Sequence, residues 1–490
     1  MSRRMSGPAL ALVMIVLTGC SSTAQINRAA APEALVIEEV AAPATLESFS
    51  PTELGSRDAP VKTPPLEAAA PSAAEVAFVA SAPSPSRAER QTAGAAKFGP
   101  GVTPGVIRIG APIPSQTVPY NFLYRETFRP NFRRVWEVIA DAINSTGGIL
   151  GRRVRLEFLS FSEDDLEAAA RQICTYFTEE IEVVAVAGPE VGTASCLDRA
   201  GIVSLSHAYS LQPDFYRRAP HAFSPMSISL ERANQLYVDG LYQQGFFSGD
   251  HRIGLLRWDE PMYESISNDV VKPALAQYGL EITEEVPITN SSVPEAQAAG
   301  WNAVGRLKDA GVDRLLTLDV ASYILPEFTD YAEAQNYYPR YGLNSLVGGE
   351  WEMERKQLEG SMGIGWLPWV DLEPRHAYRE GSEGTRRCVD LMVAAGEEAQ
   401  IDTYNEGLWS SSICDAALLL KAAIEAGGPS ITTDTIVAGA ESLDTSFASS
   451  NTLVTRFDRG RHEGVGAIRF LRWFTQCGCF RYTSGLIDAG

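Results

Sequence analysis

Two successive series of alternating strand and helix patterns constrain the fold of this chain more than any other feature. The first series starts with the apolar pattern at residues 106–110 and continues to residue 206. The second series starts after Pro225 and continues to residue 334. Strands that alternate with helices of this length form parallel sheets that are covered by helices on both faces. The sequence therefore predicts an α/β fold with two doubly wound parallel-sheet lobes.

The spacing of apolar residues sets the expected limits of these elements. In the first helix, apolar side chains recur at intervals of three and four, the period of one buried face: Phe128, Phe132, Val135, Ile139 and Ile143. Further helices are predicted at residues 163–178, 194–200, 230–240, 262–278, 294–310 and 323–334. Further strands are predicted at residues 154–158, 183–187, 202–206, 252–257, 282–288 and 314–318.

The charge balance excludes one large class of partner. The chain has 61 acidic and 41 basic residues and a formal net charge of −20. Proteins that bind nucleic acid concentrate positive charge, so we expect no nucleic-acid partner. No run of about 18 apolar residues follows residue 20, so we expect no membrane-spanning helix in the rest of the chain.

The N-terminus has the pattern of a cleaved export signal. Arg3 and Arg4 precede an apolar run at residues 9–17, which is too short to cross about 30 Å of hydrocarbon. The run ends in Leu17-Thr18-Gly19-Cys20, which resembles the bacterial lipoprotein signal. The resemblance implies a signal at residues 1–20, with Cys20 as the lipidated first residue of the mature chain. A lipid-anchored protein on the extracytoplasmic face of the cell membrane is therefore expected. A plain secreted protein is the alternative.

Residues 21–100 are rich in Ala, Pro, Ser and Glu and have few aromatic residues. Such a segment cannot bury enough apolar surface to offset the entropy of ordering it. We therefore expect a disordered tether, which separates the anchor from the folded part of the chain.

Six cysteines remain after Cys20, an even number that favours disulfides in an oxidising compartment. Six cysteines allow 15 pairings, and the pairs that are close in the sequence are the simplest choice: Cys174–Cys196, Cys388–Cys414 and Cys477–Cys479. A zinc site is the alternative, but the nearest histidine to the last pair, His462, is expected in a solvent-facing turn. We expect no metal and no cofactor.

One segment resembles a known family. The segment Ile143-Asn144-Ser145-Thr146-Gly147-Gly148-Ile149-Leu150-Gly151-Arg152-Arg153-Val154 is similar to a segment of the type I periplasmic substrate-binding proteins, the leucine/isoleucine/valine-binding family that serves ABC importers. Further matching segments follow in order at residues 187–189, 202–206, 223–225, 415–417 and 457–460. The resemblance covers approximately residues 105–490.

This resemblance implies two lobes, joined by three hinge crossovers, that close on a small molecule. The lobes are expected at residues 101–224 with 357–452, and at residues 225–356 with 453–490. In open α/β sheets, ligands bind outside the carboxyl ends of the strands. The loops after the strands of both lobes should therefore face one cleft, and an ABC permease is the implied partner.

The resemblance also implies ligand-binding residues in the first lobe. Amino-acid binders of the family hold the ligand carboxylate with loops after the third and fourth strands, where helix N-termini favour an anion. The corresponding candidates are Thr193, Tyr209 and Ser210. Helix capping is the alternative role for the hydroxyls. Glu190 and His207 depart from the family pattern, so the pocket need not suit a branched-chain amino acid.

In the second lobe the candidates are Tyr263 and Glu350. At the position of Tyr263, the family places an aromatic residue against the ligand. At the position of Glu350, it places a carboxylate that pairs with the ligand ammonium. The alternatives are a solvent-facing tyrosine and a loop glutamate. Trp366 and Trp369 are candidates for lining the cleft, although packing in the core is the favoured role.

No nucleophile elbow, phosphate loop or zinc-protease motif occurs in the sequence. The chain is therefore expected not to be an enzyme. The favoured interpretation is a solute receptor that delivers a small molecule, an amino acid or related metabolite, to an ABC importer. The alternative is a lipoprotein of the same fold that regulates an envelope enzyme or sensor without transport.

Overall fold

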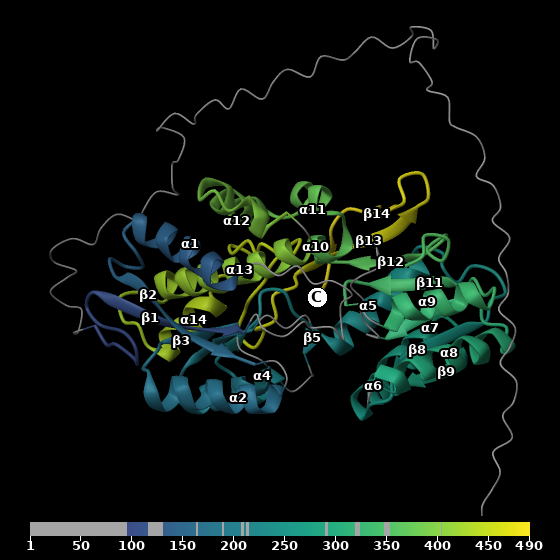
Figure 1. Cartoon of the computed structure of the whole chain (residues 1–490), viewed down its shortest axis with the longest axis horizontal. Coiled ribbons are helices and arrows are strands. Elements are labelled where there is room, and N and C mark those ends of the chain that lie inside the picture. Colours follow the sequence, from purple (N-terminus) through teal and green to yellow (C-terminus); the bar gives the residue numbers. More distant parts are fainter. Residues whose placement is uncertain are drawn as a thin grey trace, which may run out of the picture. The chain divides into compact units, whose positions relative to one another are not determined.

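The computed structural model describes residues 96–115, 131–162, 165–188, 191–206, 210–211, 215–289, 293–318, 324–346, 353–402 and 404–490. The export signal, Cys20 and nearly all of the expected tether lie outside the described residues. Within the described residues, two sheets form the framework (Figure 1).

The first sheet has five parallel strands in the order β2-β1-β3-β4-β6. Their bounds are β1 Val106–Pro114, β2 Arg153–Phe161, β3 Ala185–Ala187, β4 Val203–Leu205 and β6 Ala222–Phe223. Helices α1 Phe132–Ser145, α2 Leu166–Thr175 and α3 Ala194–Arg199 connect the strands, and α4 Phe215–Arg218 precedes β6. The predicted alternation of strands and helices is confirmed for this sheet.

The family-like segment at the end of α1 has a clear structural role. The Asn144 side chain donates a hydrogen bond to the Val154 carbonyl (3.0 Å) and accepts one from the Val154 amide (2.8 Å). The Asn144 side chain therefore gives the backbone of Val154, at the start of β2, the two hydrogen bonds that a neighbouring strand would otherwise supply. At the other end of α1, the Asn131 side chain caps the helix by accepting a hydrogen bond from the Arg134 amide.

The second sheet has the order β14-β13-β12-β11-β10-β8-β9, and β15 pairs with β13. Its strands are β8 Ile253–Trp258, β9 Ile282–Ile288, β10 Arg314–Leu318, β11 Arg340–Asn344, β12 Met362–Gly365, β13 Ala467–Phe474, β14 Cys479–Tyr482 and β15 Ile487–Asp488. Its helices are α5 Leu230–Gln243, α6 Pro261–Ile266, α7 Lys272–Gln277, α8 Val293–Asp309 and α9 Ile324–Ala334. A small separate sheet pairs β5 Ser210–Leu211 with β7 Ile228–Ser229.

The predicted fold class is confirmed, but this lobe departs from two finer expectations, the direction of its edge strands and one domain boundary. The sheet is parallel from β9 to β12, but β12–β13 and β13–β14 are antiparallel. The β13–β14 pair is antiparallel because the tight turn at residues 475–478 joins these strands as a hairpin. Residues 357–365 do not return to the first lobe, because β12 lies between β11 and β13 in the second sheet. The chain leaves this sheet only after Gly365.

The predicted helix at residues 262–278 is also interrupted. The π-helical turn Ser267–Val271 separates α6 from α7. Pro273 has no amide hydrogen to donate, which weakens regular α-helical bonding at this junction. Similarly, the helix predicted at 163–178 is α2 followed by the π-helical turn Tyr176–Glu180.

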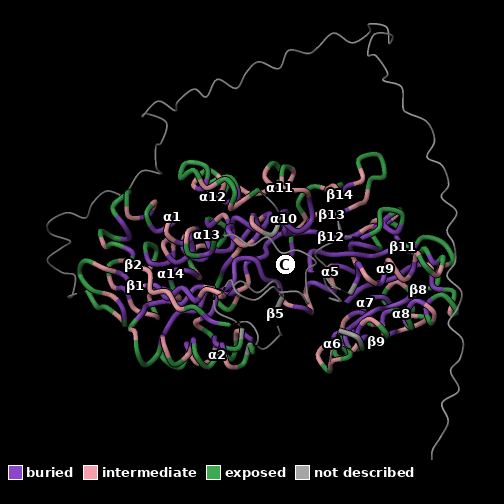
Figure 2. Tube along the Cα trace, in the orientation of Figure 1, coloured by how far each residue is buried: buried purple, intermediate pink, exposed green. Residues whose placement is uncertain are grey.

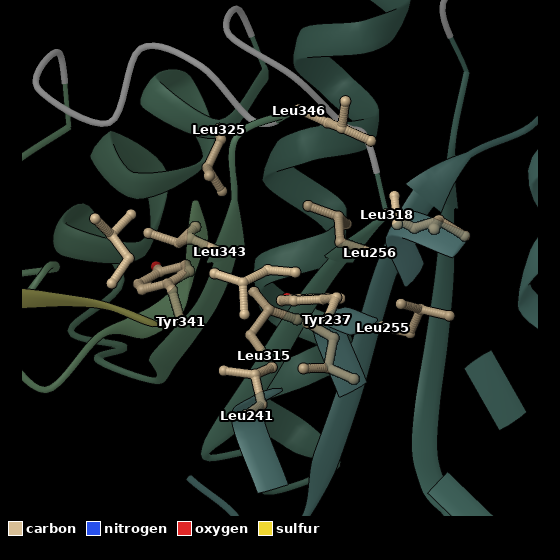
Figure 3. Packing of buried hydrophobic residues seen from close by; sticks show 14 of the residues in the cluster. Tyr237, Leu241, Leu255, Leu256, Leu315, Leu318, Leu325, Tyr341, Leu343 and Leu346 are labelled. Atoms are coloured by element: carbon tan, nitrogen blue, oxygen red, sulfur yellow. The ribbon is translucent and has the colours of Figure 1, made fainter. Parts of the chain in front are cut away.

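Each sheet carries its own apolar core (Figure 2). In the second lobe, Tyr237 of α5, Leu315 of β10 and Tyr341 of β11 lie within one cluster of buried side chains (Figure 3). In the first lobe, α13 Tyr404–Gly427 packs against α1, α12 Glu383–Ala394 and α14 Thr433–Glu441.

The stretch Glu406–Gly427 of α13 is long and apolar enough to cross a membrane. However, 78% of its most apolar window is buried within the folded chain. Its apolar residues, among them Ile413, Leu420 and Ile424, belong to the first-lobe core. The length and composition of α13 are therefore those of a central core helix.

The structure contains three disulfides: Cys174–Cys196, Cys388–Cys414 and Cys477–Cys479. The Cα separations are 6.1, 6.0 and 5.2 Å, all within the range that a disulfide can bridge. Cys388–Cys414 joins α12 to α13 inside the first-lobe core. Within the described residues, no cluster of three or more His, Cys, Asp or Glu side chains is arranged to hold a metal ion.

Candidate functional site

The expected ligand-binding residues follow the carboxyl ends of strands in both sheets where they are described. Thr193 is fully buried and ends the 3-10 turn Val191–Thr193, directly before α3. Tyr263 lies in the first turn of α6, after β8, and its exposed fraction is 9%. Tyr263 therefore packs with the second-lobe core and is not a solvent-facing tyrosine.

Of the other three candidates, the structure describes Ser210 alone. Ser210 begins β5, and its backbone pairs with Ile228 of β7. Tyr209 and Glu350 lie outside the described residues. That the five candidates face one pocket stays a prediction.

The two tryptophans after β12 are buried in the core, with exposed fractions of 0% for Trp366 and 2% for Trp369. The ring of Trp369 packs against Gly407 of α13, where a Cβ atom would lie 2.5 Å from the ring. Trp369 also borders a cavity of about 810 Å³ beside α11 Pro374–Glu380, together with Tyr378 and Val389. Among the candidates whose side chains the structure describes, Thr193 and Tyr263 do not line this cavity.

Three crossover segments join the two sheets: residues 224–227, 365–367 and 449–466. The first and third are paired through their backbones. The Ser224 amide donates to the His462 carbonyl (3.0 Å), and the Gly464 amide donates to the Ser224 carbonyl (2.8 Å). The second and third are linked by a hydrogen bond from the Leu453 amide to the Trp366 carbonyl (3.2 Å). The crossovers therefore form one hydrogen-bonded unit.

A buried carboxyl in α13 organises the third crossover. Asp415 accepts hydrogen bonds from the Ser449 hydroxyl (2.5 Å), the Ser450 amide and the Asn451 side-chain amide (3.1 Å). The same Asn451 nitrogen also donates to the Ser412 hydroxyl (3.3 Å). Burial raises the pKa of the Asp415 carboxyl, although its hydrogen bonds act in the opposite direction.

A second buried carboxyl organises the crossover at residues 365–367. Asp371, in α10 Pro368–Asp371, accepts hydrogen bonds from the Ser345 hydroxyl (2.7 Å), the Tyr482 hydroxyl (2.6 Å) and the Leu367 amide (3.1 Å). Ser345 follows β11 directly, and its hydroxyl oxygen accepts from the Trp366 amide (2.8 Å). Burial raises the pKa of Asp371 to about 7.

Two glycines permit the close approaches in this region. A Cβ atom on Gly365 would lie 2.3 Å from the Asp371 carboxyl, and one on Gly464 would lie 2.2 Å from the Pro225 carbonyl oxygen. Real Cβ contacts are not this short. The crossovers therefore need glycine at both positions.

Charged residues complete the contact between the first and third crossovers. Arg232 forms an ion pair with Glu463 (3.2 Å), and burial raises the pKa of the Glu463 carboxyl. His462 stacks on Phe223, with 4.0 Å between the ring centroids, and its Nε2 atom lies 3.1 Å from Glu441. The expectation of a solvent-facing His462 was wrong, because the pairing with Ser224 buries this segment.

Sequence reasoning missed Asp371, Ser345 and the role of Asp415. An aspartate within the apolar helix pattern around Asp415 was a usable signal, because an unpaired carboxylate is costly to bury. The polar run Ser449-Ser450-Asn451-Thr452 was the second signal. Nothing in the local sequence near Asp371 indicates that Tyr482, more than a hundred positions later, is its partner.

The described arrangement can support opening and closing around a connected set of crossovers. Both sheets contribute strands whose carboxyl ends lead to candidate ligand loops, which is where ligands bind in open α/β sheets. Buried carboxyls fix where the crossovers leave each sheet. The crossovers are also the chain segments that join the two sheets, so any relative motion of the lobes would bend the chain within them.

Known structures share this fold across most of the chain. An ABC transporter substrate-binding protein from Desulfitobacterium hafniense, in complex with Leu, has a TM-score of 0.55 and 21% identity, covering 77% of this chain and 100% of that one. An ABC transporter solute-binding protein from R. palustris, in complex with 4-hydroxybenzoate, has a TM-score of 0.58 and 15% identity, covering 78% and 97%.

A fatty acid ABC transporter substrate-binding protein from Thermomonospora curvata has a TM-score of 0.55 and 13% identity, covering 80% of this chain and 95% of that one. No family model and no curated protein matches the sequence. The similarities to solved structures establish the two-lobed fold, while the bound molecules named for those proteins differ from one another.

Proposed function

We propose that this chain, which has the fold of ABC transporter substrate-binding proteins, is an extracytoplasmic receptor that closes two lobes on a small molecule and delivers it to an ABC importer. The observation that carries the proposal is the pair of α/β sheets joined by three hydrogen-bonded crossovers. The likeness to the three solute-binding structures covers 77–80% of this chain and 95–100% of theirs.

We assign the ligand to loops at the carboxyl ends of the strands. Thr193, Tyr209 and Ser210 contact it from the first lobe, and Tyr263 and Glu350 contact it from the second. The places of Thr193 and Tyr263 support this assignment, since they follow β3 and β8 at the carboxyl ends of strands, where ligands bind in open α/β sheets. Glu350 supplies the charge that would pair with a ligand ammonium group.

The ligand class is an amino acid or a related metabolite with a carboxylate. Two named complexes in the comparisons contain a carboxylic acid or carboxylate, one with an amino group and one with a phenol. An amino acid differs from a hydroxybenzoate in its ammonium group. An ammonium group that is removed from water needs a nearby carboxylate on the protein, so the two ligand classes need different sites.

The receptor is anchored by lipid on Cys20 at the extracytoplasmic face of the cell membrane. The pattern Leu17-Thr18-Gly19-Cys20 supports this anchor, and the formal net charge of −20 does not favour binding to anionic lipid by charge. Residues 21–100 would give the folded part its reach above the membrane.

A ligand panel tests this function. Purified protein is heated with amino acids, hydroxylated benzoic acids, fatty acids, sugars and short peptides, and hits are measured by calorimetry. A ligand at 100 times its dissociation constant should add about 2.7 kcal/mol to the free energy of unfolding. A hit from the carboxylate classes supports the proposal. If none of the panel binds, the regulatory lipoprotein becomes the favoured function, and the partner is then sought among envelope proteins.

A further inference from the structure

The Cys477–Cys479 disulfide differs from the other two in its place in the fold. It lies where the turn at residues 475–478 leads into β14, at the edge of the second sheet (Figure 1). The two cysteines are 2 positions apart, compared with 22 and 26 for the other pairs. The bond therefore encloses only Gly478.

This disulfide has little to contribute to the stability of the fold. The entropic benefit of a cross-link grows with the number of residues it encloses, so it is smallest here. The hairpin is already fixed by strand pairing, with Phe474 opposite Cys479 and Trp473 opposite Phe480. The rings of Trp473 and Phe480 also pack edge to face, with 5.1 Å between their centroids.

Access to the two sulfurs is unequal. Cys477 is exposed, whereas Cys479 is 3% exposed. Both cysteines of the Cys388–Cys414 disulfide are fully buried in the first-lobe core. A thiolate arriving from solvent can therefore reach Cys477, while it cannot reach Cys388 or Cys414 in the folded protein.

A positive charge lies beside Gly478, the residue that this disulfide encloses. A Cβ atom on Gly478 would be 2.9 Å from Nη1 of Arg355, so the guanidinium group covers the residue between the two cysteines. Within the part of the chain that the structure describes, Arg355 forms no ion pair with an acid. A neighbouring cation stabilises a thiolate, which makes cysteine a better leaving group. The adjacent Phe474 is 37% exposed and offers an apolar contact for a peptide.

We propose that the Cys477–Cys479 disulfide is a thiol-exchange site that oxidises a pair of cysteine thiols in a peptide or protein. A substrate thiolate attacks Cys477 Sγ, the bond to Cys479 Sγ breaks, and Cys479 leaves as a thiolate. The second substrate thiolate then attacks the substrate sulfur of the mixed disulfide and releases Cys477. The substrate loses two electrons and gains a disulfide, and the protein gains two electrons and, from water, two protons. This activity does not depend on solute binding.

The first experiment compares the three disulfides within the native protein. The full mature chain is incubated with increasing dithiothreitol, free thiols are alkylated, and peptides are mapped by mass spectrometry. Cys477 and Cys479 should become labelled at a dithiothreitol concentration at least about tenfold below that for the fully buried Cys388–Cys414 pair, and also before Cys174–Cys196, whose two cysteines are half-buried, while circular dichroism is unchanged. Labelling of all three pairs together, or of Cys477–Cys479 last, would overturn the proposal.

The second experiment measures oxidation of a substrate. A reduced peptide with two cysteines should lose two thiols for each protein chain, and the C477S/C479S variant should oxidise none while keeping the wild-type melting profile. Arg355→Gln should slow the reaction by about threefold or more, whereas Lys356→Gln, which removes a charge paired with Glu333, should not. Equal peptide oxidation by the wild type and the C477S/C479S variant would also overturn the proposal.

Discussion

Tyr482 on the edge strand β14 donates a 2.6 Å hydrogen bond to the buried carboxyl of Asp371, the last residue of α10. The contact connects the last hairpin of the second sheet to the crossover at residues 365–367. The same carboxyl accepts from Ser345 at the end of β11 and from the Leu367 amide. Asp371 thus sets how the crossover leaves the sheet.

This contact predicts a pH-dependent stability. The pKa of Asp371 is raised by burial to about 7, above its usual value of 3.8. Between about pH 4 and pH 7 the folded state therefore binds more protons than the unfolded state, so this group's stabilising contribution is complete below pH 4 and is lost as pH rises through 7. The variant Asp371→Asn has a neutral side chain of nearly the same shape, so its stability should not fall in this way as the pH rises.

The measurement is urea unfolding of both proteins at pH 4.5 and pH 8. Relative to Asp371→Asn, the wild type should lose up to a few kcal/mol of unfolding free energy at the higher pH, since each pKa unit corresponds to about 1.4 kcal/mol. Asp309→Asn, at an exposed position, is the matched control and should show no such difference. A parallel pH dependence for wild type and Asp371→Asn would contradict the assigned role.

Gly464→Ala should destabilise the pairing of the first and third crossovers. The new Cβ atom would meet the Pro225 carbonyl oxygen at 2.2 Å, and backbone cannot move aside as a flexible side chain can. We expect a loss of about 1–3 kcal/mol in unfolding free energy, measured by urea titration. Gly485→Ala, where no atom lies within 4 Å of the added Cβ, should change it little. Equal stabilities of the two variants would show that the crossovers adapt freely.

Cys20→Ala tests the anchor. Without the cysteine, the protein should be released to the medium or remain unprocessed, because no acyl chain can be attached. Membrane fractions are probed with an antibody against the folded part of the chain. Continued recovery of processed protein in the membrane fraction would exclude the lipid anchor.

Glu350→Gln tests the ligand class. If the ligand has an ammonium group, this variant should weaken binding by more than about 1 kcal/mol, because a buried ammonium loses its charge partner. Glu354→Gln removes an equal charge from a nearby exposed position and should leave binding unchanged. Calorimetry of both variants gives the comparison, and unchanged affinity in Glu350→Gln removes this residue from the site.

Local patterns predicted the strands well. The limits expected at residues 282–288 and 314–318 are those of β9 and β10, because charged or polar residues flank each segment: Glu281 and Thr289 the first, and Asp313 and Asp319 the second. The disulfide pairs joined cysteines that are near in the sequence. In contrast, the antiparallel edge and the crossover after Gly365 depend on which distant strand lies beside β12. The spacing of apolar residues along one strand does not show which strand will be its neighbour.

In the candidate site, too, some features could be predicted from the sequence and others could not. The position of Thr193 and Tyr263 after strands could be predicted, because the strands themselves could be. The network of Asp371, Ser345 and Tyr482 could not, since its members come from three separate parts of the chain and meet only when the sheet has formed.

Closure of the lobes on a small molecule is the central claim, and a distance measurement tests it most directly. Spin labels at the exposed positions Asp141 of α1 and Asp309 of α8 report on the two lobes, and labels at Asp141 and Asp434 report within the first lobe. With a ligand from the panel, the distance between lobes should shorten and narrow in distribution while the distance within the lobe stays constant. An inter-lobe distance that does not change when calorimetry shows a saturated site would contradict the account.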